Sequence, residues 1–196
     1  MPNPSRRQFI KTSLTEIAML AAVVIGYLSI IKADTSHMAH AKIVVTTLAK
    51  ALRSIGSPVC LAAAEKLEAS QGNNANVSFH LRSAALNASD ALIIAEALKS
   101  LPTEASSALA SMSLSYNRAL GDAGAIALAQ SLPLTLRELG LVRCGIGDRG
   151  GEALLQWAKQ APGLRMMCIE ENNISEGMKL QLIELSRKNA TLLIVV

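Results

Sequence analysis

Residues 136–155 read LRELGLVRCGIGDRGGEALL, and this stretch joins a strand pattern to a helix pattern. Its first part places Leu139 and Leu141 two residues apart with other side chains between them, which is the period of a β-strand. A glycine-rich turn follows, and the residues after the Gly147-Asp148 pair suit a helix. The stretch therefore predicts one short strand that leads into one helix.

The same pattern occurs twice more in the chain. Its second strand residue is Leu114, then Leu141, then Ile169, so the spacing between the units is nearly constant. A fainter unit begins at Phe79, where the spacing from Leu81 to Leu114 is longer and requires an insertion near Leu101-Pro102-Thr103. Self-similarity at a fixed period is typical of stacked repeats.

These units resemble leucine-rich repeats of the ribonuclease-inhibitor-like kind, and the segment Gly124–Ala129 is also similar to the GALA-type repeats of bacterial effectors. The resemblance covers residues 77–196. It implies an α/β fold, a short leucine-rich-repeat solenoid with parallel strands on the concave face and helices on the convex face. It also implies a non-enzymatic protein-protein interaction module that binds its partner on the concave face.

Individual repeat positions have physical explanations. Asn117, Cys144 and Asn172 follow the strands, and we expect each to turn inward and bond the free backbone groups of its turn. The Gly-Asp pairs at Asp122 and Asp148 predict helix N-caps. Alanines at alternate positions from 125 to 129 keep the helix slim enough to stack against its neighbours.

The segments on either side of the repeats predict caps. Two helical patterns, residues 42–55 and 58–69, form a helical N-terminal cap over residues 42–76, with a loop from Gln71 to Asn76. A last helix is expected over residues 179–187. The run from Leu192 to Val196 is either a buried cap strand or an exposed edge that pairs with a second copy, which leaves a monomer or an edge-paired homodimer open.

Residues 1–41 resemble a bacterial twin-arginine export signal. The residues that carry the resemblance are Arg6, Arg7, Phe9 and Lys11 before an apolar run, and Ala39 and Ala41 as a small-x-small cleavage site. Three interpretations stay open: a cleaved signal, a membrane anchor through residues 12–32, and a cytosolic amphipathic helix. The first two place the repeats in the periplasm, in an exported form or at the inner membrane. The third fits a cytoplasmic adaptor or secreted effector.

Composition argues against several other classes. A formal charge of +4, aromatic content of 3% and the lack of a basic stripe argue against nucleic acid. Three cysteines and three histidines fit neither a disulfide framework nor a metal site. No catalytic constellation and no cofactor site is evident, so enzymatic chemistry is the third and least favoured class.

The alternation of side chains along each strand predicts the binding surface, because every second residue faces away from the core. The residues expected to bind a partner are His80, Arg82, Ser113, Ser115, Tyr116, Glu138, Val142, Arg143, Met166, Cys168 and Glu170. One end of this surface is basic at Arg82, and the other is acidic at Glu138 and Glu170. We expect a protein partner of complementary charge along it. The alternative is a solvated face without a partner. A cytosolic or host-injected effector that uses the same repeats to grip a host protein also remains open.

Overall fold

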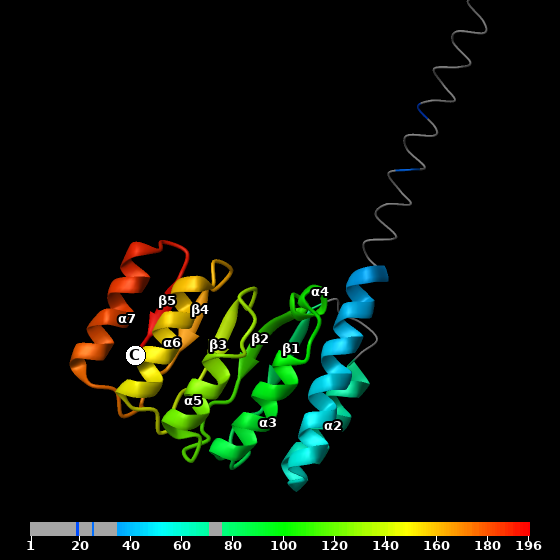
Figure 1. Cartoon of the computed structure of the whole chain (residues 1–196), viewed down its shortest axis with the longest axis horizontal. Coiled ribbons are helices and arrows are strands. Elements are labelled where there is room, and N and C mark those ends of the chain that lie inside the picture. Colours follow the sequence, from blue (N-terminus) through cyan, green and yellow to red (C-terminus); the bar gives the residue numbers. More distant parts are fainter. Residues whose placement is uncertain (1–18, 20–24, 26–34, 71–75) are drawn as a thin grey trace, which may run out of the picture. The chain divides into compact units, whose positions relative to one another are not determined.

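The computed structural model describes residues 19, 25, 35–70 and 76–196. Its central feature is one five-stranded sheet whose strands lie side by side in chain order, and every neighbouring pair is parallel (Figure 1). The strands are β1 (Val77–His80), β2 (Leu109–Ser113), β3 (Glu138–Gly140), β4 (Met166–Cys168) and β5 (Leu193–Val195). This confirms the predicted α/β class with a parallel sheet.

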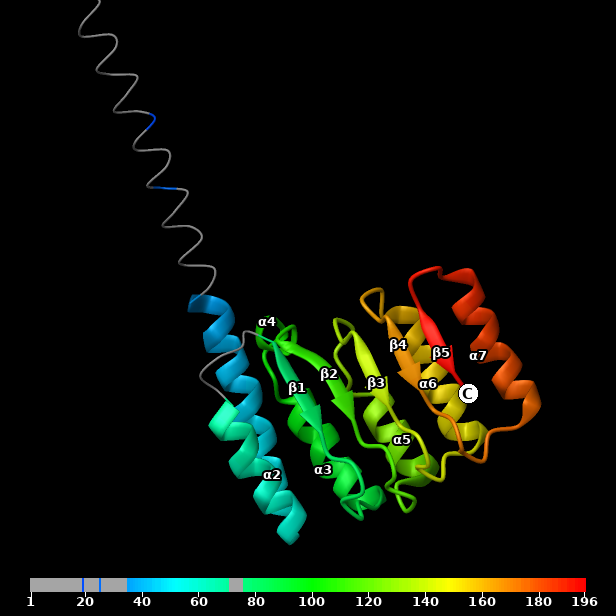
Figure 2. The same cartoon turned by 180° about the vertical axis from the view of Figure 1, so that it is seen from behind.

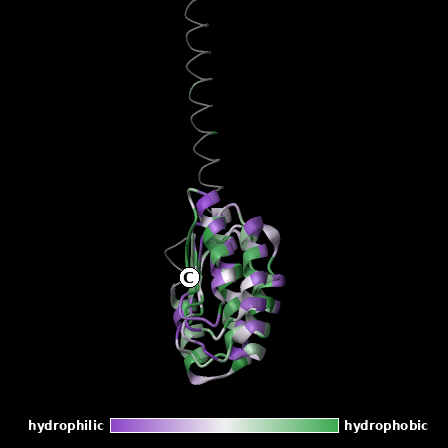
Figure 3. Cartoon of the chain, turned by 90° about the vertical axis from the view of Figure 1, so that its left-hand side faces the viewer, coloured by the Kyte–Doolittle hydropathy of each residue, from purple (hydrophilic) through white to green (hydrophobic). Residues whose placement is uncertain are grey.

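One helix follows each of the first four strands and leads back to the start of the next. These crossover helices are α3 (Ala88–Lys99), α5 (Gly121–Ala129), α6 (Asp148–Gln160) and α7 (Glu176–Lys188). They form a layer on one side of the sheet, and the strands form the layer on the other (Figures 2 and 3). We number the repeats by their strands: residues 77–108 are the first repeat, 109–135 the second, 136–163 the third and 164–192 the fourth.

The strand register follows the repeat spacing read from the sequence. Ser111 pairs with Glu138, and Glu138 pairs with Met166, so the pairing advances by one repeat at each step across the sheet. The longer first repeat contains α4 (Thr103–Ser106), a short helix at the position of the expected insertion. Met166 pairs with Leu193 in the same manner, so β5 continues the repeat pattern.

The core lies between the two layers. Inward strand residues such as Met112, Leu139 and Met167 are at most 2% exposed. The helices pack closely because small residues line their contacts: a Cβ built on Gly124 would lie 3.1 Å from the Cβ of Ala91 in the neighbouring helix. Small residues therefore set the spacing of the helix layer, as expected for Ala125, which is fully buried.

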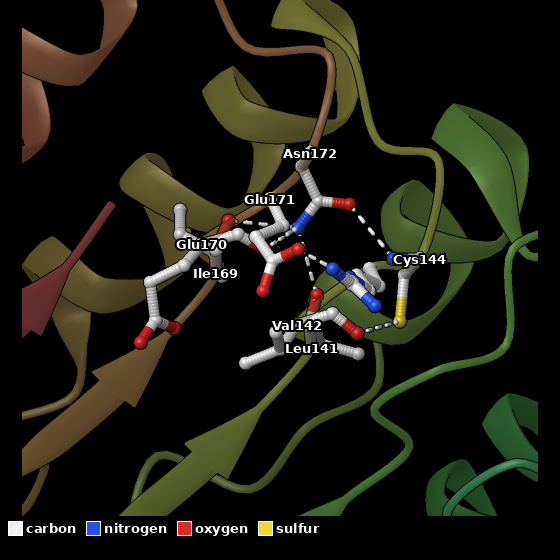
Figure 4. A network of polar contacts seen from close by, with 8 residues as sticks. Leu141, Val142, Cys144, Ile169, Glu170, Glu171 and Asn172 are labelled. Carbon is white, nitrogen blue, oxygen red and sulfur yellow. Dashed lines mark hydrogen bonds and ion pairs between the residues drawn. The ribbon is translucent and has the colours of Figure 1, made fainter.

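The inward asparagines bond backbone groups across the repeat boundary. Asn172 Oδ1 accepts from the amides of Cys144 (2.9 Å) and Ile146 (3.1 Å), and its Nδ2 donates to the carbonyls of Leu141 and Ile169 (Figure 4). Asn172 thus satisfies backbone groups in the third repeat as well as its own. The prediction that these residues turn inward is confirmed.

Asn117 does the same two boundaries earlier, between the first and second repeats. Its Oδ1 accepts from the amides of Ala84 and Leu86, and its Nδ2 donates to the carbonyls of Leu81 and Leu114.

Cys144 occupies the equivalent position at the boundary between the second and third repeats. Its Sγ contacts the carbonyl oxygen of Leu114 at 3.3 Å. Burial raises the pKa of this thiol, so it remains protonated at neutral pH and can donate.

The Gly-Asp prediction was wrong about which helix is capped. Asp122 does not cap its own helix; its Oδ1 accepts from the amides of Gly147 (2.7 Å) and Gly150 (2.9 Å), at the start of α6 in the next repeat. Asp148 likewise accepts from the amide of Ser175, which precedes α7, at 2.7 Å. Stacking brings each helix start beside the preceding repeat, so the carboxylate reaches the neighbour's free amides.

In the described stretch from residue 35 to β1 there are two helices: a helical run over residues 35–55, and α2 (Pro58–Ala69), whose bounds match the prediction. Arg53 joins the two through a bidentate pair with Glu68, at 2.7 and 2.6 Å. Leu48 and Leu52 in the first helix are fully buried. These helices therefore share the apolar core with the sheet.

Several predicted features fall wholly or partly outside the described residues. Arg6, Arg7, Phe9 and Lys11 are among them, as are residues 71–75 of the expected loop. Ala39 and Ala41 are described; both lie within the helical run over residues 35–55, and Ala41 is 6% exposed. Within the described ranges, no helix combines the length and apolar character needed to cross a membrane.

The last strand is buried on one side only. Ile194 is 7% exposed and Leu193 is 52% exposed. Within the described part of the chain, no strand pairs with the outer edge of β5.

Candidate functional site

The sheet has one face that the crossover helices leave uncovered. The helices lie on one side of the strands only (Figure 3). Side chains alternate along each strand, so every second residue points away from the helices. We call this surface the open sheet face; it comprises Ser78, His80, Ser111, Ser113, Glu138, Gly140, Met166, Cys168, Leu193 and Val195, and continues past the strand ends to Arg82, Ser115, Val142 and Glu170.

The predicted binding residues lie on this face or at its edge, at different depths. His80, Arg82, Tyr116, Glu138 and Met166 are exposed, while Ser113, Val142, Arg143, Cys168 and Glu170 are half-buried. Ser115 differs, because it is only 3% exposed and its Oγ accepts from the amide of Val142 and from the hydroxyl of Ser113. Ser115 therefore supports the surface and offers a partner little contact area.

The end of the open sheet face at β1 and β2 is small and polar. His80 Nε2 lies 3.0 Å from Ser111 Oγ, across the pair of strands. Gly140 gives the neighbouring hydroxyls room, because a Cβ there would lie 2.7 Å from Ser113 Oγ. This end therefore presents hydroxyl and imidazole groups that can hydrogen-bond to a partner.

The contact of His80 with Ser111 is not a catalytic dyad. A serine nucleophile needs a base that a third group orients, and amide donors aimed at the developing oxyanion. Among the described residues, no carboxylate bonds His80, and Ser111 is 9% exposed. No group of three or more metal-binding side chains occurs in the described ranges either.

A row of four side chains follows the strand ends. The guanidinium of Arg82 lies 4.9 Å from the centre of the Tyr116 ring, and that of Arg143 lies 5.8 Å from the same centre. Arg143 also forms an ion pair with Glu171. We call Arg82, Tyr116, Arg143 and Glu171 the strand-end row; its members come from four successive repeats and hold one another in place.

The backbone at this row is unusual. Ser83, Tyr116, Arg143 and Glu171 occupy equivalent positions in the four repeats, and all have φ between 53° and 67°. This left-handed conformation favours glycine, yet each of these residues carries a side chain. The turn after each strand therefore projects a side chain at a backbone position that costs free energy.

The end of the open sheet face at β3 and β4 is acidic. Glu138 and Glu170 flank Cys168, whose thiol pKa is raised by burial and by the negative charge of these carboxylates. The thiol is protonated at neutral pH and is a poor nucleophile. Cys168 is thus a small surface side chain and not a reactive thiol.

The sequence prediction missed the contribution of β5. Leu193 and Val195 extend the open sheet face beyond Met166 and Cys168, their partners in register. The signal was available, because Ile194 follows Met167 at the spacing of the other repeats. The terminal run was interpreted as a cap because its apolar residues do not alternate with polar ones.

Comparison with known proteins identifies the repeats. Residues 109–129 and 133–155 match the leucine-rich-repeat family model. These two segments are similar to leucine-rich repeats. They form the second repeat and most of the third, and strands of such repeats build extended binding surfaces. The repeats thus indicate a protein-interaction module.

No curated protein matches the chain. Among the solved structures that match is one described as leiomodin-1 actin-binding site 2. It is 19% identical in sequence, with a TM-score of 0.49, and the match covers 60% of this chain and 68% of that chain.

Proposed function

We propose that this protein is a non-enzymatic interaction module, a short leucine-rich-repeat solenoid that binds a protein partner on its open sheet face. The observation that carries the proposal is the uncovered strand surface and the strand-end row beside it. Arg82 and Arg143 both contact the ring of Tyr116, so large side chains are held in place before a partner arrives. Preorganised side chains lose little conformational entropy on binding, which favours affinity.

The charge distribution supports a partner of complementary charge. Arg82 lies at the β1 end of the surface, whereas Glu138 and Glu170 lie at the β3 and β4 end. Electrostatic complementarity sets the orientation of a bound partner and speeds its association. A partner segment with an acidic part over Arg82 and a basic part over the glutamates fits this pattern.

The test is a triple variant on the binding surface, Arg82→Ala with Tyr116→Ala and Glu170→Ala. Proteins captured by the full chain from its source cells are quantified by mass spectrometry. We expect the specific partner to be lost, because removal of anchor side chains costs binding free energy of about 1–4 kcal/mol each.

A helix-side variant is the matched control, with Arg149→Ala, Gln181→Ala and Glu104→Ala at exposed positions. It should capture the partner as the unaltered chain does. Equal capture by both triple variants would refute the binding-surface proposal.

We further propose that the module acts outside the cytoplasm, exported or tethered to the membrane. This proposal rests on the resemblance of residues 1–41 to an export signal. A mature form that begins at Lys42 would keep Val44, Leu48 and Leu52, which are buried in the core. Ala39 and Ala41 lie within the helical run over residues 35–55, so cleavage after Ala41 would require the start of this helix to unwind.

The N-terminal residue and intact mass, measured after expression in a bacterium with a working twin-arginine system, test the location. A start near Lys42 supports export. An intact N-terminus in the membrane fraction supports an anchor. An intact N-terminus in the soluble fraction rejects both export and the membrane anchor, and it supports a cytosolic adaptor or a host-injected effector.

A further inference from the structure

The end of the open sheet face built by β3, β4 and β5 combines carboxylates with exposed apolar side chains. Glu138 pairs in register with Met166, and Met166 pairs with Leu193. Met166 is 39% exposed and Leu193 is 52% exposed, which is high for such large apolar side chains. An acidic residue and two apolar ones therefore lie side by side across three strands.

Glu170 completes this group from the end of β4. Its Oε2 atom is buried and has no hydrogen-bond partner among the described residues. The nearby cation Arg143 is engaged by Glu171, and the Glu170 carboxylate points away from Asn172 (Figure 4). A buried carboxylate oxygen without a donor is costly, so a rotation of the half-buried Glu170 side chain that turns this oxygen toward a cation from outside would be favourable.

The spacing of the two carboxylates limits what can bind them together. Glu138 lies beside Met166, and Glu170 follows Met166 by four residues. Four residues of extended chain span about 13 Å, which is too far for a single cation to contact both carboxylates. The half-buried Cys168 lies between them, so the middle of the group is weakly polar.

We propose that this end of the open sheet face binds a basic segment of a partner protein in extended conformation. One arginine or lysine pairs with Glu170, and a second, four residues away, pairs with Glu138. An apolar side chain between them lies over Cys168 and Val195, and an apolar side chain next to the second basic residue packs on Met166 and Leu193. This inference rests on the proposed function and specifies the chemistry of the partner for one end of the face.

The probe is a fluorescein-labelled peptide with the core Arg-Ser-Leu-Ser-Arg, titrated with the full chain and followed by fluorescence anisotropy. A matched peptide with glutamate in place of both arginines serves as the charge-reversed probe. We expect the arginine peptide to bind and the glutamate peptide not to bind. Binding should weaken as salt rises, because the paired charges are partly exposed.

The deciding variant is Glu138→Gln with Glu170→Gln. This double variant keeps the shape of both side chains and removes both charges. It should lower the affinity for the arginine peptide about tenfold, because hydrogen bonds to charged groups are stronger than neutral ones. The control is Glu65→Gln with Glu104→Gln, which removes the same charge from exposed helix positions. Circular dichroism establishes that both double variants are folded.

The outcomes separate this inference from the proposed function. Equal weakening by both double variants would show general charge attraction and overturn the inference, and so would unchanged affinity in the Glu138 and Glu170 double variant. Binding of the glutamate peptide, or of neither peptide, would also overturn it. Loss of the captured partner in the Arg82, Tyr116 and Glu170 triple variant would still support the proposed function in those cases.

Discussion

At the scale of single residues, each inward asparagine bonds several backbone groups through one side chain. Asn117 is 1% exposed, and its side chain bonds four backbone groups from two repeats. A strand followed by a tight turn leaves such groups without partners, and water cannot reach them in the interior. One amide side chain serves both donors and acceptors, which explains why asparagine suits this position.

We predict that Asn117→Ala lowers the free energy of unfolding by at least about 3 kcal/mol, because each buried backbone group left unsatisfied costs about 1–3 kcal/mol. Urea unfolding followed by circular dichroism measures the change. Asn173→Ala is the control, because that residue is exposed and only its backbone amide bonds the core. A similar loss for both variants would contradict the explanation.

At the scale of helices, close packing depends on glycine where α5 and α6 meet. A Cβ on Gly150 would lie 2.7 Å from Ile146 Cγ2, 2.8 Å from Asp122 Oδ1 and 3.0 Å from Ala125 Cβ. The glycine therefore lets α6 approach α5 and lets the carboxylate of Asp122 reach the helix start.

Gly150→Ala should destabilise the protein by about 1–3 kcal/mol, because overpacking outweighs the higher helix propensity of alanine. Gly177→Ala in α7 is the matched control, since the nearest atom to its added Cβ is Ser175 Oγ at 3.9 Å. We expect that control to be neutral or slightly stabilising. Thermal unfolding of the two variants side by side distinguishes the effects, and equal behaviour would argue against tight packing at α5 and α6.

The hydrogen bonds at the start of α7 predict that the stability of the protein depends on pH. Bonds from the backbone and side chain of Ser175 lower the pKa of Asp148 in the folded state. A lowered folded-state pKa stabilises the protein above the unfolded value of about 3.9, and this stabilisation is lost as the pH falls through the folded value. Asp148→Asn should therefore be less stable than the unaltered chain at neutral pH, with the difference closing in acid.

Urea midpoints measured from pH 7 to pH 2.5 test this expectation. Glu104→Gln serves as the control, because it removes an exposed carboxylate that makes no side-chain hydrogen bond among the described residues. A stability difference for Asp148→Asn that stays constant over this range would contradict the role of its charge.

At the scale of the whole molecule, the sheet is protected unequally at its two edges. Residues 41–52 and α2 pack into the core beside β1, whereas β5 has no strand on its outer side in the described part of the chain. In repeat arrays each unit contacts mainly its neighbours, so a cap stabilises the nearest repeat most.

Leu48→Ala should therefore increase hydrogen exchange more in β1 than in β4. The substitution leaves a cavity and costs about 2–5 kcal/mol in a well-packed core. Leu92→Ala, at a position that is 50% exposed, should change neither strand. If hydrogen exchange became faster by the same factor in β1 and β4, the array would unfold as one unit, without local effects of the cap.

Much of this architecture could be predicted because its signals are local and repeated. The strand register, the insertion in the first repeat and the inward asparagines follow from residue types at fixed spacings. The partner of Asp122 could not be predicted in this way, because the bonded amides belong to a helix in the next repeat. The burial of Ser115 was missed for a similar reason: its hydroxyl bonds the backbone of the neighbouring strand.

The candidate site was predictable only in outline. The alternation of side chains along the strands identifies the exposed residues. It does not predict the stacking of Arg82 on Tyr116, because that contact depends on how neighbouring repeats are placed in space. It also gives no sign that Oε2 of Glu170 lacks a hydrogen-bond partner among the described residues. Such contacts arise from side-chain geometry across repeats, and a single sequence does not specify it.

The polar bonds across the repeat boundaries make the order of the repeats part of the fold. Asn117 secures the first boundary, Cys144 and Asp122 share the second, and Asn172 and Asp148 share the third. Each boundary thus has its own set of donors and acceptors, although the apolar positions are alike. The partners are backbone groups that every repeat presents, so exchanging a repeat would keep the apolar core and change which side chain satisfies them: asparagine, cysteine or aspartate. The units are alike in outline, but their boundaries differ in how they are bonded.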